Sequence, residues 1–230
     1  MPELRYAQFC PLARAAEVLG HRWTLLVLRE LMTGPQRFSD LLARLPGLSR
    51  SVLTERLADL EARQVVARRE LPPPTAVTVY ELTARGRALR PALLALTRWG
   101  LHFLEPPRPD DHTEPDWVPL AVETFARPGP TPPRRLELVA EDGRRRARVR
   151  VAGGPKGTHL LDADAPVEAS LQGAVPVLLG LMAGAVPVRD AVAAGRVRLD
   201  GDLDAAAELP ALFDADPEWI PEDAPQGVPS

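Results

Sequence analysis

The chain has 230 residues, of which 45% are hydrophobic and 26% charged, so it is long enough for two ordinary folded domains. Its single cysteine excludes an intramolecular disulfide framework. No apolar run reaches the roughly 18 residues that a membrane helix needs, and residues 1–5 lack a signal peptide's pattern. We therefore expect a cytoplasmic protein without membrane contact.

The net charge of −3 hides an asymmetry between two halves. Residues 1–105 hold 15 arginines against 10 acidic residues, a net charge of +5, whereas residues 106–230 have a net charge of −8. Nucleic-acid phosphates require a basic surface, so the N-terminal half is the candidate DNA-binding part. The acidic half is not expected to lie on DNA.

Residues 1–10 are predicted to form a short arm, followed by helices over 12–18 and 23–32 with a break near Gly20. The second helix is apolar nearly all round, which predicts that it is mostly buried. Its apolar residues are Trp23, Leu25, Leu26, Leu28 and Leu31. Trp23 could stack on a ligand, but such a tryptophan is more often part of a core or a dimer interface.

Residues 34–61 predict two short amphipathic helices joined by a tight turn. The apolar positions 38, 41, 42 and 45 share one face of the first helix, and 53, 57 and 60 share one face of the second. Pro46 and Gly47 force the turn, and Ser49 is a good N-cap for the second helix. This order is typical of a helix-turn-helix, whose second helix enters the DNA major groove.

Two sets of side chains are candidates for DNA contacts. Arg50, Ser51 and Thr54 lie on the polar face of the second helix and are expected to face base edges. A second set is expected to hold phosphates, and it consists of Ser49, Arg56, Arg37 before the motif, and Arg68 or Arg69 on the following strand.

Residues 64–71 and 77–82 have the composition of two strands around the stiff loop 72–75. Two strands directly after a recognition helix predict a β-wing. The alternative is a surface helical hairpin beside an unrelated β-hairpin, which the order of elements disfavours.

Thr83 is predicted to cap a long helix over residues 84–104, with a kink or break near 88–90 because Pro91 falls inside it. Its apolar stripe consists of Leu89, Leu93, Leu96, Trp99 and Phe103. We expect this stripe to form part of a dimer seam, the alternative being simple packing onto the winged helix.

Several motifs of the N-terminal half resemble one family. They are Cys-Pro-Leu-Ala-Arg at 10–14, Leu-Gly-His-Arg-Trp at 19–23, Gly-Pro-Gln-Arg-Phe at 34–38, Leu-Thr-Glu-Arg-Leu at 53–57, Tyr-Glu-Leu-Thr at 80–83, and Gly86. Over residues 8–105 the chain is similar to the HxlR-type winged helix-turn-helix regulators. The resemblance implies a dimeric transcriptional regulator that binds double-stranded DNA. Some proteins of this type have a thiol sensor near the position of Cys10, which makes Cys10 a candidate redox sensor, although a free cysteine is otherwise an inert apolar residue.

The segment 106–115 has a linker's composition, and a second domain is expected over 116–220 with a tail over 221–230. A hairpin is predicted from strands 136–140 and 146–151 around Asp142 and Gly143. Arg146, Arg148 and Arg150 share one face of it. They could form an anion site, but the solvated face of a half-buried sheet is the favoured interpretation.

Beyond His159 the sequence predicts short strands at 160–165 and 167–171, helices at 175–182 and 188–194, a strand and turn at 196–202, and a last helix at 203–213. Residues 120–215 are similar to sterol carrier protein-like domains, which implies an α/β (α+β) layer with an apolar tunnel for lipid-like ligands. The helix at 175–182 is apolar almost throughout, so an apolar small molecule is expected against Val175, Leu178, Leu179 and Met182.

Catalytic and cofactor signals are weak. The glycine-rich loop 153–158 has the order Lys-Gly-Thr, unlike a phosphate-binding loop, and is predicted to join two strands. The four histidines have no metal-ligand spacing, so no metal, no cofactor and no enzyme activity are expected. The sequence thus predicts a multi-domain, DNA-binding transcriptional regulator, mainly α with a β-wing in its N-terminal domain. The alternative is a lipid-carrier-type binding protein whose winged helix serves only for dimerisation.

Overall fold

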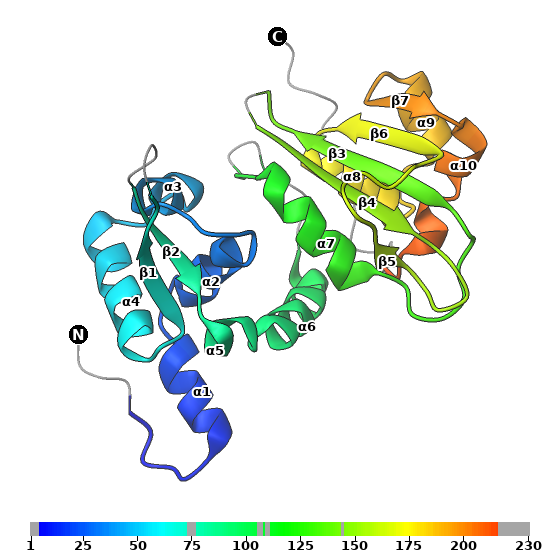
Figure 1. Ribbon diagram of the computed structural model, residues 1–230. Coiled ribbons are helices and arrows are strands. Elements are labelled where there is room, and N and C mark those ends of the chain that lie inside the picture. The colour runs from blue at the N-terminus through cyan, green and yellow to red at the C-terminus, as the bar shows by residue number, and fades with distance from the viewer. Residues whose placement is uncertain (1–4, 73–76, 105–107, 109–110, 144, 216–230) are drawn as a thin grey trace. The chain divides into compact units, whose positions relative to one another are not determined.

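The computed structural model describes all residues except 1–4, 73–76, 105–107, 109–110, 144 and 216–230 (Figure 1). The chain forms two compact units, Met1–Leu93 and Leu94–Ser230. Parts of the loop expected at 72–75, of the linker expected at 106–115, and all of the tail expected at 221–230 lie outside the described residues. Among the helices that are described, none is long and apolar enough to cross a membrane.

The first unit is a winged helix-turn-helix. Its elements are α1 (Pro11–Leu19), α2 (Thr24–Met32), α3 (Phe38–Arg44), α4 (Arg50–Ala62), β1 (Val66–Glu70), β2 (Thr78–Leu82) and α5 (Ala84–Arg87), and α6 (Arg90–Gly100) begins in it. Strands β1 and β2 pair antiparallel, with Val66 opposite Leu82. The predicted helices, turn and wing are therefore confirmed, with bounds that shift by one or two residues.

A leucine core and one buried carboxylate fix the helices of the first unit. Leu28, Leu41 and Leu53 are fully buried. Glu30 on α2 is buried as well, and its carboxylate accepts hydrogen bonds from Arg29 and, at 3.3 Å, from Arg44 on α3. This pairing satisfies a charge that would otherwise be costly to bury, and it joins α2 to the first helix of the motif.

The prediction that the second helix is mostly buried is wrong for one side of it. Leu25 and Leu26 on α2 are about two-fifths exposed, at 38% and 40%. The core reaches only Val27, Leu28 and Leu31, because α3 and β2 contact α2 from one side.

The predicted long helix after the wing is broken, as expected from Pro91. It divides into α5 and α6 at residues 88–89, followed by the 3-10 turn η1 (Leu101–Phe103). Thr83 is its N-cap, with a side-chain oxygen that accepts a hydrogen bond from the amide of Gly86 at 3.1 Å. Gly86 is required there, because a Cβ atom would lie 2.2 Å from the backbone oxygen of Val65.

The second unit is an α+β domain. Its further elements are η2 (Pro115–Trp117), α7 (Val118–Phe125), β3 (Arg135–Glu141), β4 (Arg146–Ala152), β5 (His159–Leu160), β6 (Ala169–Gly173), α8 (Val175–Met182), α9 (Val188–Ala193), β7 (Val197–Gly201), α10 (Leu203–Ala207) and η3 (Leu209–Leu212). The strand order is β5-β4-β3-β6-β7, in which β3 and β6 are parallel and the other pairs antiparallel. The sequence missed α7, and its strand at 160–165 is reduced to β5.

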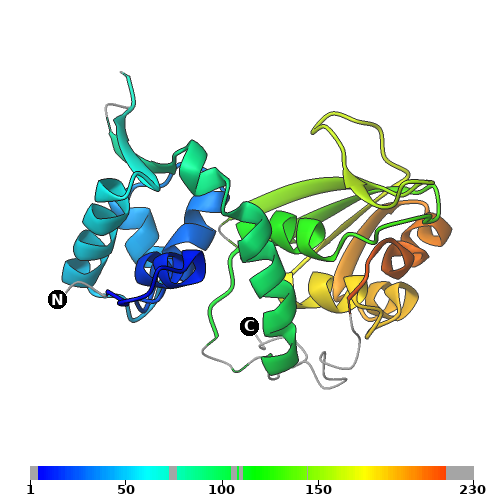
Figure 2. The same ribbon diagram turned by 90° about the horizontal axis from the view of Figure 1, so that it is seen from below.

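The two faces of this sheet differ in chemistry. Leu136, Leu138 and Leu171 point to one face and are buried against the helices, which gather on that side in Figure 2. The opposite face, here called the open face, is polar and charged. Apart from Val139, which is buried, its side chains are Glu137, Glu141, Arg146, Arg148, Arg150, Ser170, Gln172, Arg198 and Asp200, as the strand registers require.

Candidate nucleic-acid interface

The turn between α3 and α4 is built from local features of the sequence. Gly47 has a φ of +84°, which other residues rarely adopt, and a Cβ atom on it would lie 3.7 Å from the Trp23 ring. The hydroxyl of Ser49 accepts a hydrogen bond from the amide of Val52 at 3.3 Å. Ser49 is therefore the N-cap of α4, as predicted.

The three side chains predicted to face base edges lie together on the exposed face of α4. Arg50, Ser51 and Thr54 are all exposed. The Arg50 guanidinium lies over the Phe38 ring, 5.8 Å from its centroid, and the Thr54 hydroxyl donates to the backbone oxygen of Arg50 at 2.9 Å. This arrangement gathers hydrogen-bonding groups at the N-terminal end of the helix, where recognition helices contact base edges.

Arg56 does not suit the phosphate contact that the sequence predicts for it. Its side chain is only 6% exposed and pairs with Glu55 at 2.7 Å and with Asp59 at 3.9 Å. The helix turns position 56 toward the core between Leu53 and Leu60. The apolar spacing already contained this signal, since positions 53, 56, 57 and 60 follow the i, i+3, i+4, i+7 pattern of one face.

The two wing arginines are in different environments. Arg68 is exposed. Arg69 donates two hydrogen bonds to the carboxylate of Glu81 on the neighbouring strand, at 3.1 and 2.9 Å. The pair with Glu81 neutralises the charge of Arg69, so the wing presents Arg68 as its better phosphate donor.

Arg37 is exposed and directly precedes α3. Its position is fixed by its neighbour Gln36, whose backbone pairs with Tyr80 of the wing through two hydrogen bonds of 2.9 and 2.7 Å. The sequence did not indicate this bridge, because the two segments are far apart along the chain.

Cys10 is the N-cap residue of α1. It is half-buried and is followed by Pro11 at the first helical position.

The family comparison agrees with this geometry. A model of the HxlR-like helix-turn-helix family matches residues 18–108. The uncharacterized HTH-type transcriptional regulator YvaP of Bacillus subtilis is 38% identical over 104 residues, which are 45% of this chain and 96% of that relative. The chain belongs to the HxlR family. The HTH-type transcriptional regulator YodB of Bacillus subtilis is 37% identical over 98 residues, 42% of this chain and 88% of YodB.

A solved structure of the reduced form of YodB shares 35% identity and covers 44% of this chain and all of that one, with a TM-score of 0.38. These relatives are transcriptional regulators, so the HxlR-family chain is a DNA-binding transcriptional regulator. The family match ends at residue 108 and therefore does not identify the C-terminal domain.

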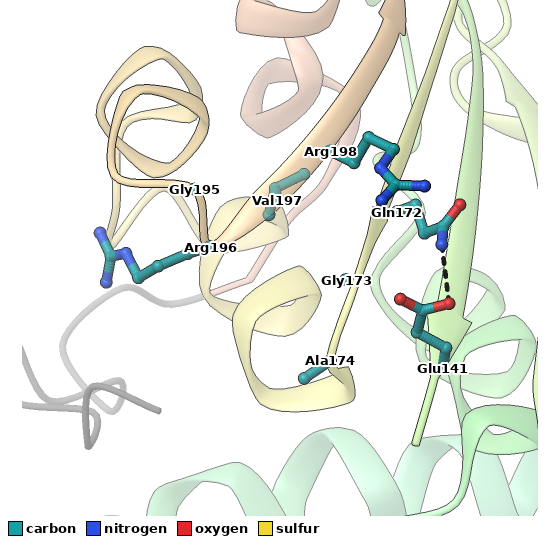
Figure 3. A pocket seen from close by; sticks show the side chains of 8 residues that line it. All are labelled: Glu141, Gln172, Gly173, Ala174, Gly195, Arg196, Val197 and Arg198. Atoms are coloured by element: carbon teal, nitrogen blue, oxygen red, sulfur yellow. Dashed lines mark hydrogen bonds between the residues drawn. The ribbon is translucent and has the colours of Figure 1, made fainter. Parts of the chain in front are cut away.

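The residues predicted to bind an apolar ligand lie in the core of that domain. Val175, Leu178 and Met182 are at most 3% exposed, and Leu179 packs against the same core. A pocket near this helix reaches it only at Ala174, before its first turn (Figure 3). The apolar ligand stays a prediction.

Proposed function

We propose that this HxlR-family regulator binds its operator as a dimer, with α4 of each subunit in the major groove. The observation that supports it is the exposed face of α4, where Arg50, Ser51 and Thr54 lie beside the capped start of the helix. Arg50 is the candidate guanine reader, since a guanidinium matches the two acceptors of guanine in the major groove. Arg37, Ser49 and Arg68 are the proposed phosphate contacts.

The dimer is supported by apolar side chains that are exposed in the described part of the chain. Leu96, Trp99 and Phe103 are 44%, 60% and 67% exposed, and the rings of Trp99 and Phe103 lie 4.7 Å apart. Leu89 and Leu93 instead pack into the core of the first unit. The proposed seam is therefore shorter than the predicted stripe, and it begins after Leu93. A contiguous exposed apolar row of this kind is typical of a protein interface.

The test is a fluorescence-anisotropy titration of DNA from the gene's own upstream region. We expect Arg50→Ala to weaken operator binding by about 1–3 kcal/mol and to relax base choice. The matched control is Arg63→Ala, which removes the same charge at the far end of α4, where Arg63 pairs with Asp59 at 3.0 Å. Equal losses in the two variants would show that Arg50 does not read a base. Wild-type protein that binds no DNA would favour the lipid-carrier alternative.

A second proposal concerns regulation by an apolar small molecule. It rests on the similarity of residues 120–215 to sterol carrier protein-like domains and on the apolar helix α8. A ligand between α8 and the sheet would change DNA affinity only if it distinguished two states of the protein. We expect a lipid extract to shift operator affinity by a coupling of about 1–3 kcal/mol. An operator affinity that stays unchanged with fatty acid, sterol and total lipid extract would contradict this proposal.

Thiol sensing at Cys10 is a separate proposal, supported by its place at the start of α1 beside the exposed Phe9. We expect hydrogen peroxide to change the operator affinity of the wild type and to leave Cys10→Ser unchanged. Equal responses of the two proteins would exclude Cys10 as the sensor.

A further inference from the structure

The C-terminal domain has an open pocket of about 380 Å³ at one end of its sheet (Figure 3). It lies where β6 ends, β7 begins and α8 starts. Its lining consists of Glu141, Gln172, Gly173, Ala174, Gly195, Arg196, Val197 and Arg198. The pocket is distinct from the apolar core beneath the sheet, because only Val197 of these residues belongs to that core.

The polar side chains on one wall of the pocket already make hydrogen bonds within the protein. The side-chain amide of Gln172 donates to the Glu141 carboxylate at 2.7 Å, and its oxygen accepts a hydrogen bond from Arg146. Gln172 is thereby held from both ends. The carboxylate oxygen of Glu141 that faces Gln172 is thus already hydrogen-bonded (Figure 3).

The two arginines that line the pocket differ from Gln172 and Glu141, because their side chains make no such hydrogen bonds within the described residues. Arg198 lies opposite Gln172 in the β6–β7 register, and its guanidinium lies near Gln172, whereas the side chain of Arg196 points away from Gln172 and Glu141 (Figure 3). Within the described residues, neither guanidinium has a hydrogen-bond or ion-pair partner. A guanidinium offers up to five N–H donors in a planar fork that matches carboxylate and phosphate oxygens.

The backbone adds to the positive character of the site. Ala174 is the N-cap residue of α8, so the positive end of the helix dipole faces the pocket. The amide of Arg196 bonds to the backbone oxygen of Ala191 at 2.9 Å, which holds the loop that supplies this arginine.

We propose that this pocket binds a small anion with carboxylate or phosphate groups, held by Arg198. Residues 106–230 have a net charge of −8, so the long-range field of this half disfavours the approach of an anion. The affinity must then come from the guanidinium of Arg198 and from the N-terminal end of α8. This inference concerns binding alone and stands whether or not the anion changes operator affinity.

The test is isothermal titration calorimetry of the full chain, without DNA, using citrate and inorganic phosphate at constant ionic strength. We expect saturable binding of at least one probe, and a Kd at least tenfold higher in Arg198→Gln. Arg198→Lys keeps the charge but loses the planar fork of donors. Its Kd should lie between those of the wild type and Arg198→Gln. The matched control is Arg148→Gln, which removes an exposed charge from the same open face outside the pocket and should keep the wild-type Kd.

Three outcomes would overturn the proposal. The first is the absence of saturable binding for both probes. The second is a loss of probe affinity in Arg148→Gln equal to that in Arg198→Gln, which would mean that the whole open face attracts anions without a defined site. The third is a loss of operator affinity in Arg198→Gln without any probe present, because Arg198 would then contact DNA phosphates. Binding of citrate alone or of phosphate alone supports the proposal and identifies the anionic group.

Discussion

The two arginines of the wing are neighbours with different partners. Both are exposed, but Arg69 is paired with Glu81, whereas Arg68 lies on the opposite face of β1. Each phosphate contact that is lost lowers the slope of log K against log salt by about 0.9. We expect Arg68→Ala to lower this slope by about one and to weaken all DNA sequences alike, and Arg69→Ala to change it little.

The measurement is operator affinity at several salt concentrations. Arg69→Ala is the matched control, because it removes the same charge one residue away. Equal changes of slope in the two variants would mean that the Arg69–Glu81 pair opens on DNA.

Glu137 makes the stability of the C-terminal domain depend on pH. Burial raises the pKa of this carboxyl, but hydrogen bonds from Arg150 and Ser170 outweigh burial and leave the pKa below its ordinary value of 4.5. A carboxyl whose pKa is lowered on folding stabilises the fold above its unfolded pKa, and the contribution is lost as the pH falls through the folded value.

We therefore expect Glu137→Gln to be less stable than wild type at pH 7, and the difference to shrink below pH 4.5, near the ordinary pKa. Urea unfolding at several pH values measures it. Asp164→Asn, which changes an exposed carboxyl in a loop, is the control. A stability difference that stays constant from pH 7 to pH 3 would contradict the prediction.

Local patterns predicted most of the candidate site, because its elements depend on near neighbours in the sequence. Ser49 caps α4 and Arg50, Ser51 and Thr54 share its outer face, as helix periodicity requires. The pairing of Arg69 could not be predicted, since it depends on the register of two strands. The stacking of Arg50 on Phe38 depends likewise on how α3 meets α4.

At the scale of elements, α5 lies unusually close to the start of β1. The Thr83 hydroxyl donates to the backbone oxygen of Gln64 at 2.6 Å, and Gly86 lies against Val65. A methyl group at position 86 would require the backbone to move. We expect Gly86→Ala to destabilise the protein by about 1–3 kcal/mol, as overpacking does.

Gly100 offers the matched control, because it is also helical and a Cβ atom on it would meet no atom within 4 Å. Gly100→Ala should be neutral or stabilise by up to about 1 kcal/mol. Urea unfolding followed by circular dichroism compares the two. A lower stability of Gly100→Ala than of Gly86→Ala would show that the close contact with Val65 does not exclude a side chain at position 86.

The elements of the C-terminal domain differ in how far the sequence predicts them. Helix α8 has the predicted bounds, because its apolar run is closed by Gly184 at a φ of +73°. Helix α7 was missed, because it follows closely on the Pro-rich linker predicted at 106–115 and itself contains Pro119. Proline is compatible with the first turn of a helix, where Pro119 lies in α7.

At the scale of the whole molecule, the exposed row on α6 and η1 predicts a dimer. We expect the wild type to have twice the monomer mass by light scattering at micromolar concentration. The double variant Trp99→Ala and Phe103→Ala should be monomeric and bind operator more weakly, because two half-sites can no longer be occupied together.

The control is Leu160→Ala, which removes a side chain of 47% exposure from β5, an element that is not part of this row. It should remain dimeric. A wild type that is monomeric, or a double variant that stays dimeric, would place the seam elsewhere or exclude it.

The central strand β3 has a consequence for synthesis on the ribosome. Its antiparallel neighbour β4 follows it closely in the chain, but its parallel neighbour β6 begins only at Ala169. Until β6 and α8 have been made, one edge of β3 has no partner strand, and α7 alone is available to cover the apolar face of the nascent hairpin. Unpaired edges and apolar faces are where growing chains aggregate. A ribosome that pauses after this hairpin has emerged, but before β6 has, would therefore hold the chain in an aggregation-prone state.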